Sequence, residues 1–416
     1  MKDIFSSAAA FALAFALFLS GCAATGGGHS DDNDGSYFVQ LGLAREDLYI
    51  DGENLSVGDY EQLMGELRTL LNGLEEKFSV EIGESDLSRV NGAEAGQAVS
   101  VSEETAALMQ MSREFAEESG GKFSPALYPL TELWGFSPAN AGHYTDPRPS
   151  PSEESLQGAR EVSELSLFSL EEGNSVVKSA SGAKLDFGGI AKGYMCDAVV
   201  SYIYEKYEGS DIDGIVNVSS SNSAYLGRKR DGQTLRGYNV GIENPRRLTT
   251  GISEGLYLVG VTDASVTTSA DNYRFYVYDG KIYPHIIDPE TGAPADRGII
   301  SVTVVVPNAS HKNAGAFADA LSTAAFCMPL TDAIGFFETL SQKYGIGAVI
   351  ITRDFKYYAV GDVTVMNRKE YAEYIGVGSE NIEEVFSEGN KNSATDEIAA
   401  CREETEYIAK VESILN

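Results

Sequence analysis

Three short segments of the sequence combine residues that could act on an anionic ligand. In the first, residues 185–194, a Gly-Gly pair precedes a helical pattern that carries Lys192. A glycine turn that opens a helix exposes backbone N–H groups at the positive end of the helix dipole, and Lys192 adds a mobile charge, so the segment suits a phosphate. Asp186 could accept hydrogen bonds from a ligand ring or sugar. By itself the segment also fits a tight turn with a surface lysine, and it matches neither a P-loop nor a kinase signature.

The second segment surrounds Asp319 and Thr323, which are four residues apart and therefore share one face of a predicted helix. Alanine and phenylalanine dominate their neighbourhood, and a carboxylate in such a helix is costly unless it is paired or binds a metal. One carboxylate, one hydroxyl and the phosphates of a ligand would suit Mg²⁺, which prefers oxygen ligands. The alternative is an aspartate that caps or salt-bridges a neighbouring element.

The third segment, residues 285–292, begins with His285 and continues into Asp-Pro-Glu-Thr-Gly. Proline and glycine at these places are good turn chemistry, so we favour a purely structural role for 288–292. His285 differs from the other three histidines because it occupies a strand-like position beside a sharp turn. An ordinary imidazole has a pKa near 6.5 and is a useful general base, although a buried structural histidine is the other interpretation.

The charge balance restricts the partners of the protein. The 416 residues include 31 Lys+Arg and 62 Asp+Glu, a formal net charge of −31. Such a surface repels phosphate backbones, so we expect no nucleic-acid partner. For an anionic ligand to bind, a metal ion or a lysine inside a cleft would have to offset the repulsion from this negative charge. The 43% hydrophobic content excludes wholesale disorder, and the length allows one large domain or two to three smaller ones.

The N-terminal residues predict export and lipidation. An apolar run over 8–19 is too short for a comfortable membrane span. It leads into Leu-Ser-Gly-Cys22, which resembles a bacterial lipobox. We therefore predict a signal peptide at 1–21, a flexible tether at 22–35, and a cell-membrane lipoprotein held through lipid on Cys22 at the extracytoplasmic side. An ordinary secretory signal with a chance cysteine is the alternative. The remaining cysteines do not form a Cys-x-x-Cys pair, and buried thiols are expected at Cys196 and Cys327.

The elements that must position these groups mix helices with strands. Helical spacing or capping signals predict helices at 59–78, 101–119, 191–207 and 314–326. Strands are predicted at 215–226, 238–242, 257–261, 273–278 and 299–306, with a hairpin-like pair at 348–352 and 357–360. Regular β-α alternation is absent from this order, which indicates an α+β architecture with sheets flanked by helices.

Taken together, the segments resemble the FAD:protein FMN transferase family, also called ApbE. The resemblance runs from about 78 to 360 in the family's order, and the ordered combination is more specific than any one motif. The matching pieces are 85–91, 120–125, 129–130, 133–136, 185–194, 240–245, 267–269, 285–292 and 318–323. It implies an ApbE-like flavin transferase fold, of class α+β with mixed or antiparallel sheets flanked by helices. We place this domain at 36–365, followed by an acidic helical C-terminal extension at 366–416.

The resemblance also implies a reaction and the residues that perform it. Such enzymes cleave the FAD pyrophosphate with Mg²⁺ and transfer FMN to a Thr or Ser hydroxyl of a partner protein, releasing AMP. His285 matches the histidine proposed to deprotonate that hydroxyl. By the family pattern, the FAD contacts are Asp186, Lys192, the backbone near Ile287, and Ser124, Pro125 and Ala126. The metal ligands are the carbonyl of Gly189 and the side chains of Asp319 and Thr323, with Ser322 as a further candidate.

The chain departs from the family pattern at several places. Residues 217–222 read Asn-Val-Ser-Ser-Ser-Asn where the family usually has Asn followed by Gly-Gly, and Ala270 stands where glycine is frequent. Ser322 occupies a position that can carry a second aspartate, and no Met-Gly-Thr strand is found around 38–43. Two alternatives stay open: an FAD pyrophosphatase that uses the same site, and a non-catalytic flavin-binding lipoprotein. The acceptor motif of such partners, approximately Asp-[Gly/Ser]-x-[Ser/Thr]-[Gly/Ala]-(Ala)-Thr, has no clean match here, so we expect an acceptor protein in trans.

Overall fold

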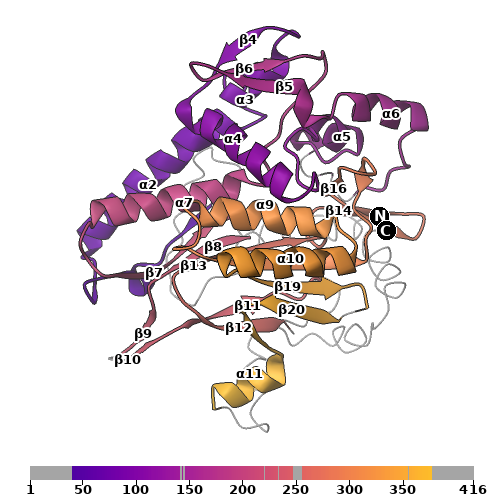
Figure 1. Ribbon diagram of the computed structural model, residues 1–416. Coiled ribbons are helices and arrows are strands. Elements are labelled where there is room, and N and C mark those ends of the chain that lie inside the picture. The colour runs from indigo at the N-terminus through magenta and orange to yellow at the C-terminus, as the bar shows by residue number, and fades with distance from the viewer. Residues whose placement is uncertain are drawn as a thin grey trace, which may run out of the picture.

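The computed structural model describes residues 40–140, 143, 146–219, 221–232, 234–246, 255–354 and 356–376. Its centre is one antiparallel sheet in the order β20-β19-β18-β13-β8-β7-β2-β3, with β1 paired to β7 (Figure 1). The strands are β1 (Leu41–Gly42), β2 (Tyr49–Ile50), β3 (Glu53–Asn54), β7 (Ile212–Val218), β8 (Asn222–Leu226), β13 (Ala264–Ala270), β18 (Ile299–Pro307), β19 (Gly347–Thr352) and β20 (Tyr357–Gly361).

Helices cover one face of this sheet. α7 (Ala191–Lys206), α9 (Ala314–Phe326) and α10 (Leu330–Tyr344) lie across it, and α2 (Val57–Phe78) packs against α7 (Figure 1). α9 is buried along almost its whole length, because it contacts β13 and β18 below and α7 beside it. The main hydrophobic core lies between these helices and the sheet.

A smaller sheet covers the opposite face. Its order is β11-β12-β21, with β11 at Tyr238–Ile242, β12 at Leu256–Val261 and β21 at Thr364–Met366. A second core, which includes Leu258, Val266 and Val349, fills the space between the two sheets. α11 (Arg368–Tyr374) then contacts β12 and β21.

Shorter elements complete the described part of the chain. The helices are α3 (Asp86–Gly92), α4 (Glu103–Glu118), α5 (Tyr128–Leu133) and α6 (Glu153–Glu161), with 3₁₀ turns at Arg45–Asp47, Pro138–Asn140 and Leu165–Leu167. The strands form the sheet β4-β6-β5 and three hairpins: β4 (Ala98–Ser100), β5 (Phe168–Glu171), β6 (Ser175–Lys178), β9 (Lys229–Asp231), β10 (Thr234–Arg236), β14 (Phe275–Tyr278), β15 (Lys281–Pro284), β16 (Ile287–Asp288) and β17 (Ala293–Pro294).

The predicted α+β class and most predicted elements are confirmed. Ser102 caps α4 by accepting from Thr105 N at 3.2 Å. The Asp279-Gly280 turn joins β14 to β15 with positive φ values of 49° and 68°, as this dipeptide favours. The single strand expected over 215–226 is wrong, because the chain turns at Ser219 and forms the antiparallel pair β7 and β8.

Some predictions fall outside the described residues. The signal peptide, the tether, Cys22 and most of the C-terminal extension belong to this group. Cys196 and Cys327 are buried free thiols, as expected. Within the described ranges, no helix combines the length and apolarity needed to cross a membrane.

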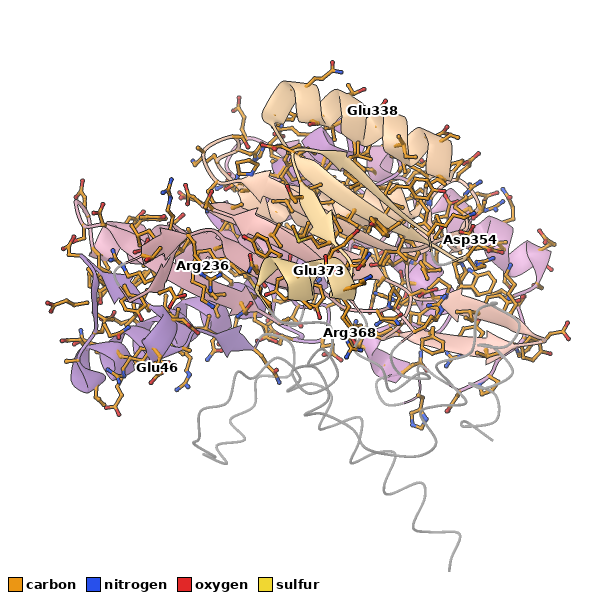
Figure 2. All side chains as sticks on the ribbon, turned by 90° about the horizontal axis from the view of Figure 1, so that it is seen from below. Glu46, Arg236, Glu338, Asp354, Arg368 and Glu373 are labelled. Carbon is orange, nitrogen blue, oxygen red and sulfur yellow. The ribbon has the colours of Figure 1, made fainter. Side chains whose placement is uncertain are left out.

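Charged side chains are distributed around the outside of the molecule. Glu46, Glu338, Asp354 and Glu373 are exposed and lie on different elements (Figure 2). Exposed carboxylates of this kind are solvated and need no catalytic explanation.

The turn at Ser219 provides a prediction about stability. Ser219 has a φ of +58°, a left-handed conformation that costs a residue with a Cβ about 1–2 kcal/mol. Glycine adopts it freely but loses more chain entropy, so Ser219→Gly should stabilise the fold by about 0.5–1 kcal/mol in urea unfolding. Ser175→Gly, in the extended strand β6, is the matched control and should destabilise. Equal destabilisation by both changes would contradict a strained Ser219.

Candidate functional site

The glycine-rich turn before α7 is held in place by backbone contacts. The Asn91 side chain accepts from Leu185 N at 2.7 Å and donates to Leu185 O at 2.8 Å, which fixes the segment that leads to Asp186. Asp186 N donates to Pro125 O at 2.8 Å. The predicted FAD contacts at 124–126 and at Asp186 therefore lie side by side.

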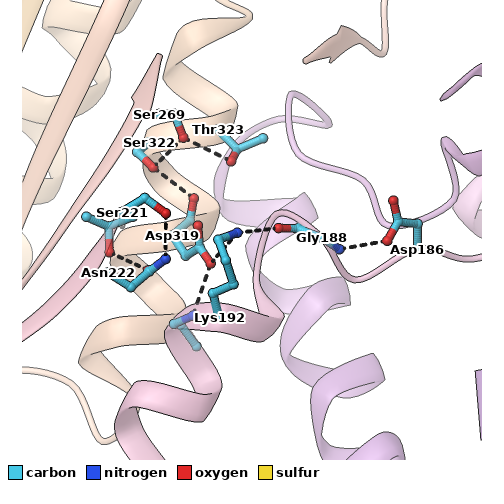
Figure 3. A network of polar contacts seen from close by, with 12 residues as sticks. Asp186, Gly188, Lys192, Ser221, Asn222, Ser269, Asp319, Ser322 and Thr323 are labelled. Carbon is cyan, nitrogen blue, oxygen red and sulfur yellow. Dashed lines mark hydrogen bonds and ion pairs between the residues drawn. The ribbon is translucent and has the colours of Figure 1, made fainter. Parts of the chain in front are cut away.

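A chain of polar contacts crosses the turn from Asp186 to α9. Gly188 N donates to Asp186 Oδ1 at 2.9 Å, and Lys192 Nζ donates to Gly188 O at 2.7 Å. The same Nζ is 3.7 Å from Asp319 Oδ2 (Figure 3). Two segments more than 120 residues apart in sequence thus contribute one cation and two carboxylates to a single site.

Two glycines allow α7 and α9 to approach closely enough for this arrangement. A Cβ on Gly193 would lie 2.2 Å from Gly315 O, so a larger residue would force the helices apart. Gly193 N donates to Asp319 Oδ2 at 3.0 Å. From α7, Asp197 accepts from Gly315 N at 2.7 Å and from Ala316 N at 2.8 Å, which satisfies the first turn of α9.

Burial makes the carboxylates of the site unusually sensitive to nearby positive charge. Asp319 is only 3% exposed. Loss of solvation raises its pKa, against the opposing effects of Lys192 and of the Gly193 N–H. Burial likewise raises the pKa of Asp186, opposed by the Gly188 N–H, Lys192 and Arg274. A cation placed between these groups would be favoured because it restores the charged forms.

Three hydroxyl groups gather at the same turn of α9. Ser322 Oγ donates to Asp319 O at 3.0 Å and is 2.8 Å from Ser269 Oγ on β13. Ser269 Oγ is also 3.3 Å from Thr323 Oγ1 (Figure 3). A Cβ built on Gly189 would be 3.4 Å from Thr323 Oγ1, so the glycine turn passes directly over this hydroxyl. Among the four predicted metal residues, Gly189 therefore lies close to Thr323, and Ser322 contacts the backbone carbonyl of Asp319.

His285 has the protonation state that a general base requires. Its backbone N donates to Arg274 O at 2.9 Å, and its Nδ1 lies 3.2 Å from the same carbonyl. Because a carbonyl only accepts, Nδ1 carries the hydrogen and Nε2 keeps its lone pair. Burial, together with the positive charges of Arg274 and Lys192, lowers the pKa of His285 to about 3. The positive charge of Lys192 thus acts on the pKa of both His285 and Asp319.

The strand after His285 is tied to the end of α9. Cys327, the C-cap of α9, places Sγ 3.6 Å from Ile287 O, so the backbone expected to contact FAD is fixed to the helix of the metal residues. Asp288 is buried, pairs with Arg297 at 2.5 Å and accepts from Glu290 N at 2.9 Å. These contacts agree with the structural role favoured for 288–292.

This geometry can be compared with known proteins. Residues 47–350 match the model of the ApbE family. The chain belongs to the ApbE family. The predicted resemblance to this family is therefore confirmed.

Curated relatives of this ApbE chain have names that state an activity. The FAD:protein FMN transferase of Treponema pallidum is 35% identical over 269 residues, covering 63% of this chain and 70% of the relative. That of Vibrio cholerae is 28% identical over 251 residues, covering 60% and 70%. Both names describe flavin transferase enzymes.

Solved structures extend the similarity to the fold. The flavin transferase ApbE from Vibrio cholerae superposes with a TM-score of 0.61 at 25% identity, covering 77% of this chain and 97% of that structure. The ApbE protein from Thermotoga maritima gives 0.61 at 26% identity, with the same coverage of both chains. The predicted ApbE-like fold is thus confirmed.

The residues of this ApbE site fit a hard divalent cation. Carboxylate, hydroxyl and carbonyl oxygens are the donors that Mg²⁺ prefers. In the part of the chain that the structure describes, no three or more His, Cys, Asp or Glu side chains form a metal-binding group. Asp319 is the one carboxylate among the four candidates, a set suited to an ion that completes its coordination with phosphate oxygens and water rather than to an all-protein cage.

Sequence reasoning missed several residues of the ApbE site. Asn91 and Ser269 lie in stretches that match the family, but a single sequence gives no sign of their partners. Lys178 is only 3% exposed and donates to Asn91 O at 2.6 Å and Ala183 O at 3.1 Å, behind the glycine-rich turn. Arg274 contributes both the carbonyl that holds His285 and a positive charge near it. Its position before β14 carried no local signal.

Proposed function

We propose that the protein is a Mg²⁺-dependent FAD:protein FMN transferase, which cleaves FAD, transfers FMN to a Thr or Ser hydroxyl of a partner protein and releases AMP. The observation that carries the proposal is the meeting of two kinds of group in one site. Lys192 and the oxygens around Asp319 suit a pyrophosphate with its cation, and a neutral His285 lies within the electrostatic influence of Lys192. The names of the curated relatives support the same activity.

The substrate contacts follow from the residues at the turn. Lys192 would bind the pyrophosphate, Asp186 and the adjacent 124–126 segment would bind other parts of FAD, and the Ile287 backbone would line the site. Gly189, Asp319 and Thr323 would hold Mg²⁺, with Ser322 as a fourth candidate. When bound, this ion neutralises charge that develops on the phosphates during cleavage. Because the protein has a net charge of −31, such local positive charge is needed to bind an anionic substrate.

The transfer step requires an attack on phosphorus and one proton transfer. The acceptor hydroxyl oxygen forms a bond to the FMN phosphorus while the bond from that phosphorus to the AMP oxygen breaks, and AMP leaves with the electron pair. The hydroxyl proton goes to Nε2 of His285, the nitrogen that keeps its lone pair. Lys192 stabilises the phosphate charge throughout the step.

We also propose where the enzyme acts. The lipobox-like sequence before Cys22 supports a lipid-anchored protein at the extracytoplasmic side of the cell membrane. The 22–35 tether would then allow a transferase domain at 36–365 to reach acceptor proteins at the membrane. Metabolic labelling with palmitate tests this, since the wild type should incorporate label and Cys22→Ala should not.

Release of AMP distinguishes the transferase from the alternatives. The purified protein with FAD and Mg²⁺ should release AMP slowly alone and rapidly with a peptide that contains the family acceptor motif. The control is the same peptide with Val in place of the acceptor Thr, which should not accelerate release. Rapid release without peptide would indicate a pyrophosphatase, and tight FAD binding without release would indicate a non-catalytic flavin protein.

A further inference from the structure

We propose that Ser269 is a positioning residue that holds the Thr323 hydroxyl with its lone pairs turned toward the cation and phosphate site. The proposal rests on the proposed function and assigns Ser269 a role in it. Ser269 lies on β13, Thr323 on α9, and their hydroxyl oxygens are 3.3 Å apart (Figure 3).

The direction of the hydrogen bonds follows from proton counting. Each hydroxyl has one proton to donate. Ser322 is 3.0 Å from Asp319 O, a carbonyl that only accepts, so the Ser322 proton is committed there. Ser322 then accepts at 2.8 Å from Ser269, whose own proton is used in that bond. The remaining contact is satisfied only if Thr323 donates to Ser269.

This order determines what Thr323 offers to a ligand. Its proton points to Ser269, and its lone pairs are left for a cation. A hydroxyl that coordinates a metal needs this orientation, because a proton pointed at the ion would repel it. We call this series of hydrogen bonds the hydroxyl relay: it runs from Thr323 through Ser269 and Ser322 to the Asp319 carbonyl. The relay fixes the orientation of the Thr323 hydroxyl without a charged group.

The surroundings of the relay keep it rigid. At Ser269, β13 pairs with β18 opposite Val302, its pairing with β8 extends as far as Thr267, and α9 packs against it. Ser322 is completely buried. Side chains alternate along a strand, so Ser269 faces α9 while Thr268 faces the other side and pairs with Thr303 at 2.8 Å.

The relay also explains how serine functions at position 322. An ionised aspartate, which the family can carry there, has no proton to donate to the Asp319 carbonyl. In this chain Ser322 acts as the buried end of the relay, and the protein ligands of the ion are Gly189, Asp319 and Thr323. Nothing in the family resemblance gave Ser269 a role.

Direct metal binding tests the relay without relying on turnover. Mn²⁺, which accepts the same oxygen donors as Mg²⁺, is titrated into the full chain in detergent and followed by electron paramagnetic resonance. Ser269→Ala should weaken binding by about tenfold, as removal of a group that orients a metal ligand does. Ser269→Thr keeps the hydroxyl and should bind like the wild type. Thr268→Val is the matched control on the opposite face and should leave binding unchanged.

A double-mutant cycle shows whether Ser269 acts through Thr323. In a Thr323→Val background, Ser269→Ala should have no further effect on Mn²⁺ affinity. An equal loss in both backgrounds, or no loss in either, would overturn the relay. The melting temperature of each variant should be close to that of the wild type. If substitutions in β13 weakened binding by disturbing the fold, the melting temperature would fall, and Thr268→Val would weaken Mn²⁺ binding as well.

FMN transfer by the wild type is measured separately. If the wild type transfers FMN and the Ser269→Ala variant binds Mn²⁺ as tightly as the wild type, the relay alone is contradicted. A wild type that neither transfers FMN nor binds Mn²⁺ contradicts both the relay and the proposed function.

Discussion

Asp319→Ala is expected to lower the rate of FMN transfer by about a thousandfold or more, since under the proposed function the site then loses the one carboxylate among its candidate metal residues and the charge that would hold the cation. Asp319 is 3% exposed and accepts from Gly193 N at 3.0 Å, with Lys192 at 3.7 Å. The measurement is the rate of AMP release with FAD, Mg²⁺ and acceptor peptide. A mutant with more than a tenth of the wild-type rate would contradict the assignment of Asp319 to the metal.

Asp319→Asn separates this chemical role from a structural one. The amide keeps the size of the side chain and still offers an oxygen to the Gly193 N–H, but it lacks the charge. We expect activity to fall almost as far as in Asp319→Ala, with the melting temperature unchanged or higher, because the desolvation cost of a buried carboxylate is removed while its size and its contact with the Gly193 N–H are kept. A melting temperature well below that of the wild type would show that the charge stabilises the fold.

His285→Ala is expected to lower kcat by about 10²–10⁴-fold, the usual contribution of a general base, with little change in the KM for FAD. His285 is held through two contacts to the Arg274 carbonyl, and Nε2 keeps the lone pair that would accept the proton in the proposed reaction. The matched control is His143→Ala, whose side chain is 71% exposed in a loop and should retain full activity. A rise in the KM for FAD as large as the fall in kcat would indicate that His285 contributes to FAD binding as well as to proton transfer.

The pH dependence gives the same assignment a second test. The pKa of His285 is lowered to about 3 by burial and by the charges of Arg274 and Lys192, so the base is neutral at any pH well above this value. His285 stops acting as a base as the pH falls through its pKa and the ring becomes protonated. The acid limb of kcat/KM should therefore lie below pH 6.5, and the limb of kcat should lie higher, since bound phosphates favour the protonated ring. A kcat/KM limb at an ordinary histidine pKa would contradict the buried environment.

Local sequence patterns predicted the elements whose signal is contained within the element. The leucines of α2 recur at helical spacing, and Asp279-Gly280 defines a hairpin without reference to the rest of the chain. β13 was missed because Ala264–Ala270 contains mostly small and hydroxyl side chains, which pack between two strands without an apolar alternation. α10 begins at Leu330, and its N-cap residue, Pro329, has no side chain that can cap the helix, so its start had no clear signal.

In the candidate site, too, features that depend on neighbouring residues were predicted and features that depend on distant residues were not. The four-residue spacing of Asp319 and Thr323 predicted a common helix face, and the cost of a buried carboxylate predicted a positive partner. The identity of that partner depends on the close crossing of α7 and α9 at Gly193 and Gly315, which no local pattern reveals. The protonation state of His285 likewise depends on the Arg274 carbonyl, which a hairpin brings to it from outside the motif.

The most direct test of the account is the covalent product. The wild-type protein is incubated with FAD, Mg²⁺ and a peptide that carries the acceptor motif, and both flavin fluorescence on the peptide and free AMP are measured. We predict a fluorescent peptide whose mass has increased by one FMN, formed in equal amount to AMP, with no product when the acceptor Thr is replaced by Val. AMP formed without a flavinylated peptide, or no cleavage of FAD at all, would contradict the proposal that this ApbE protein is a flavin transferase.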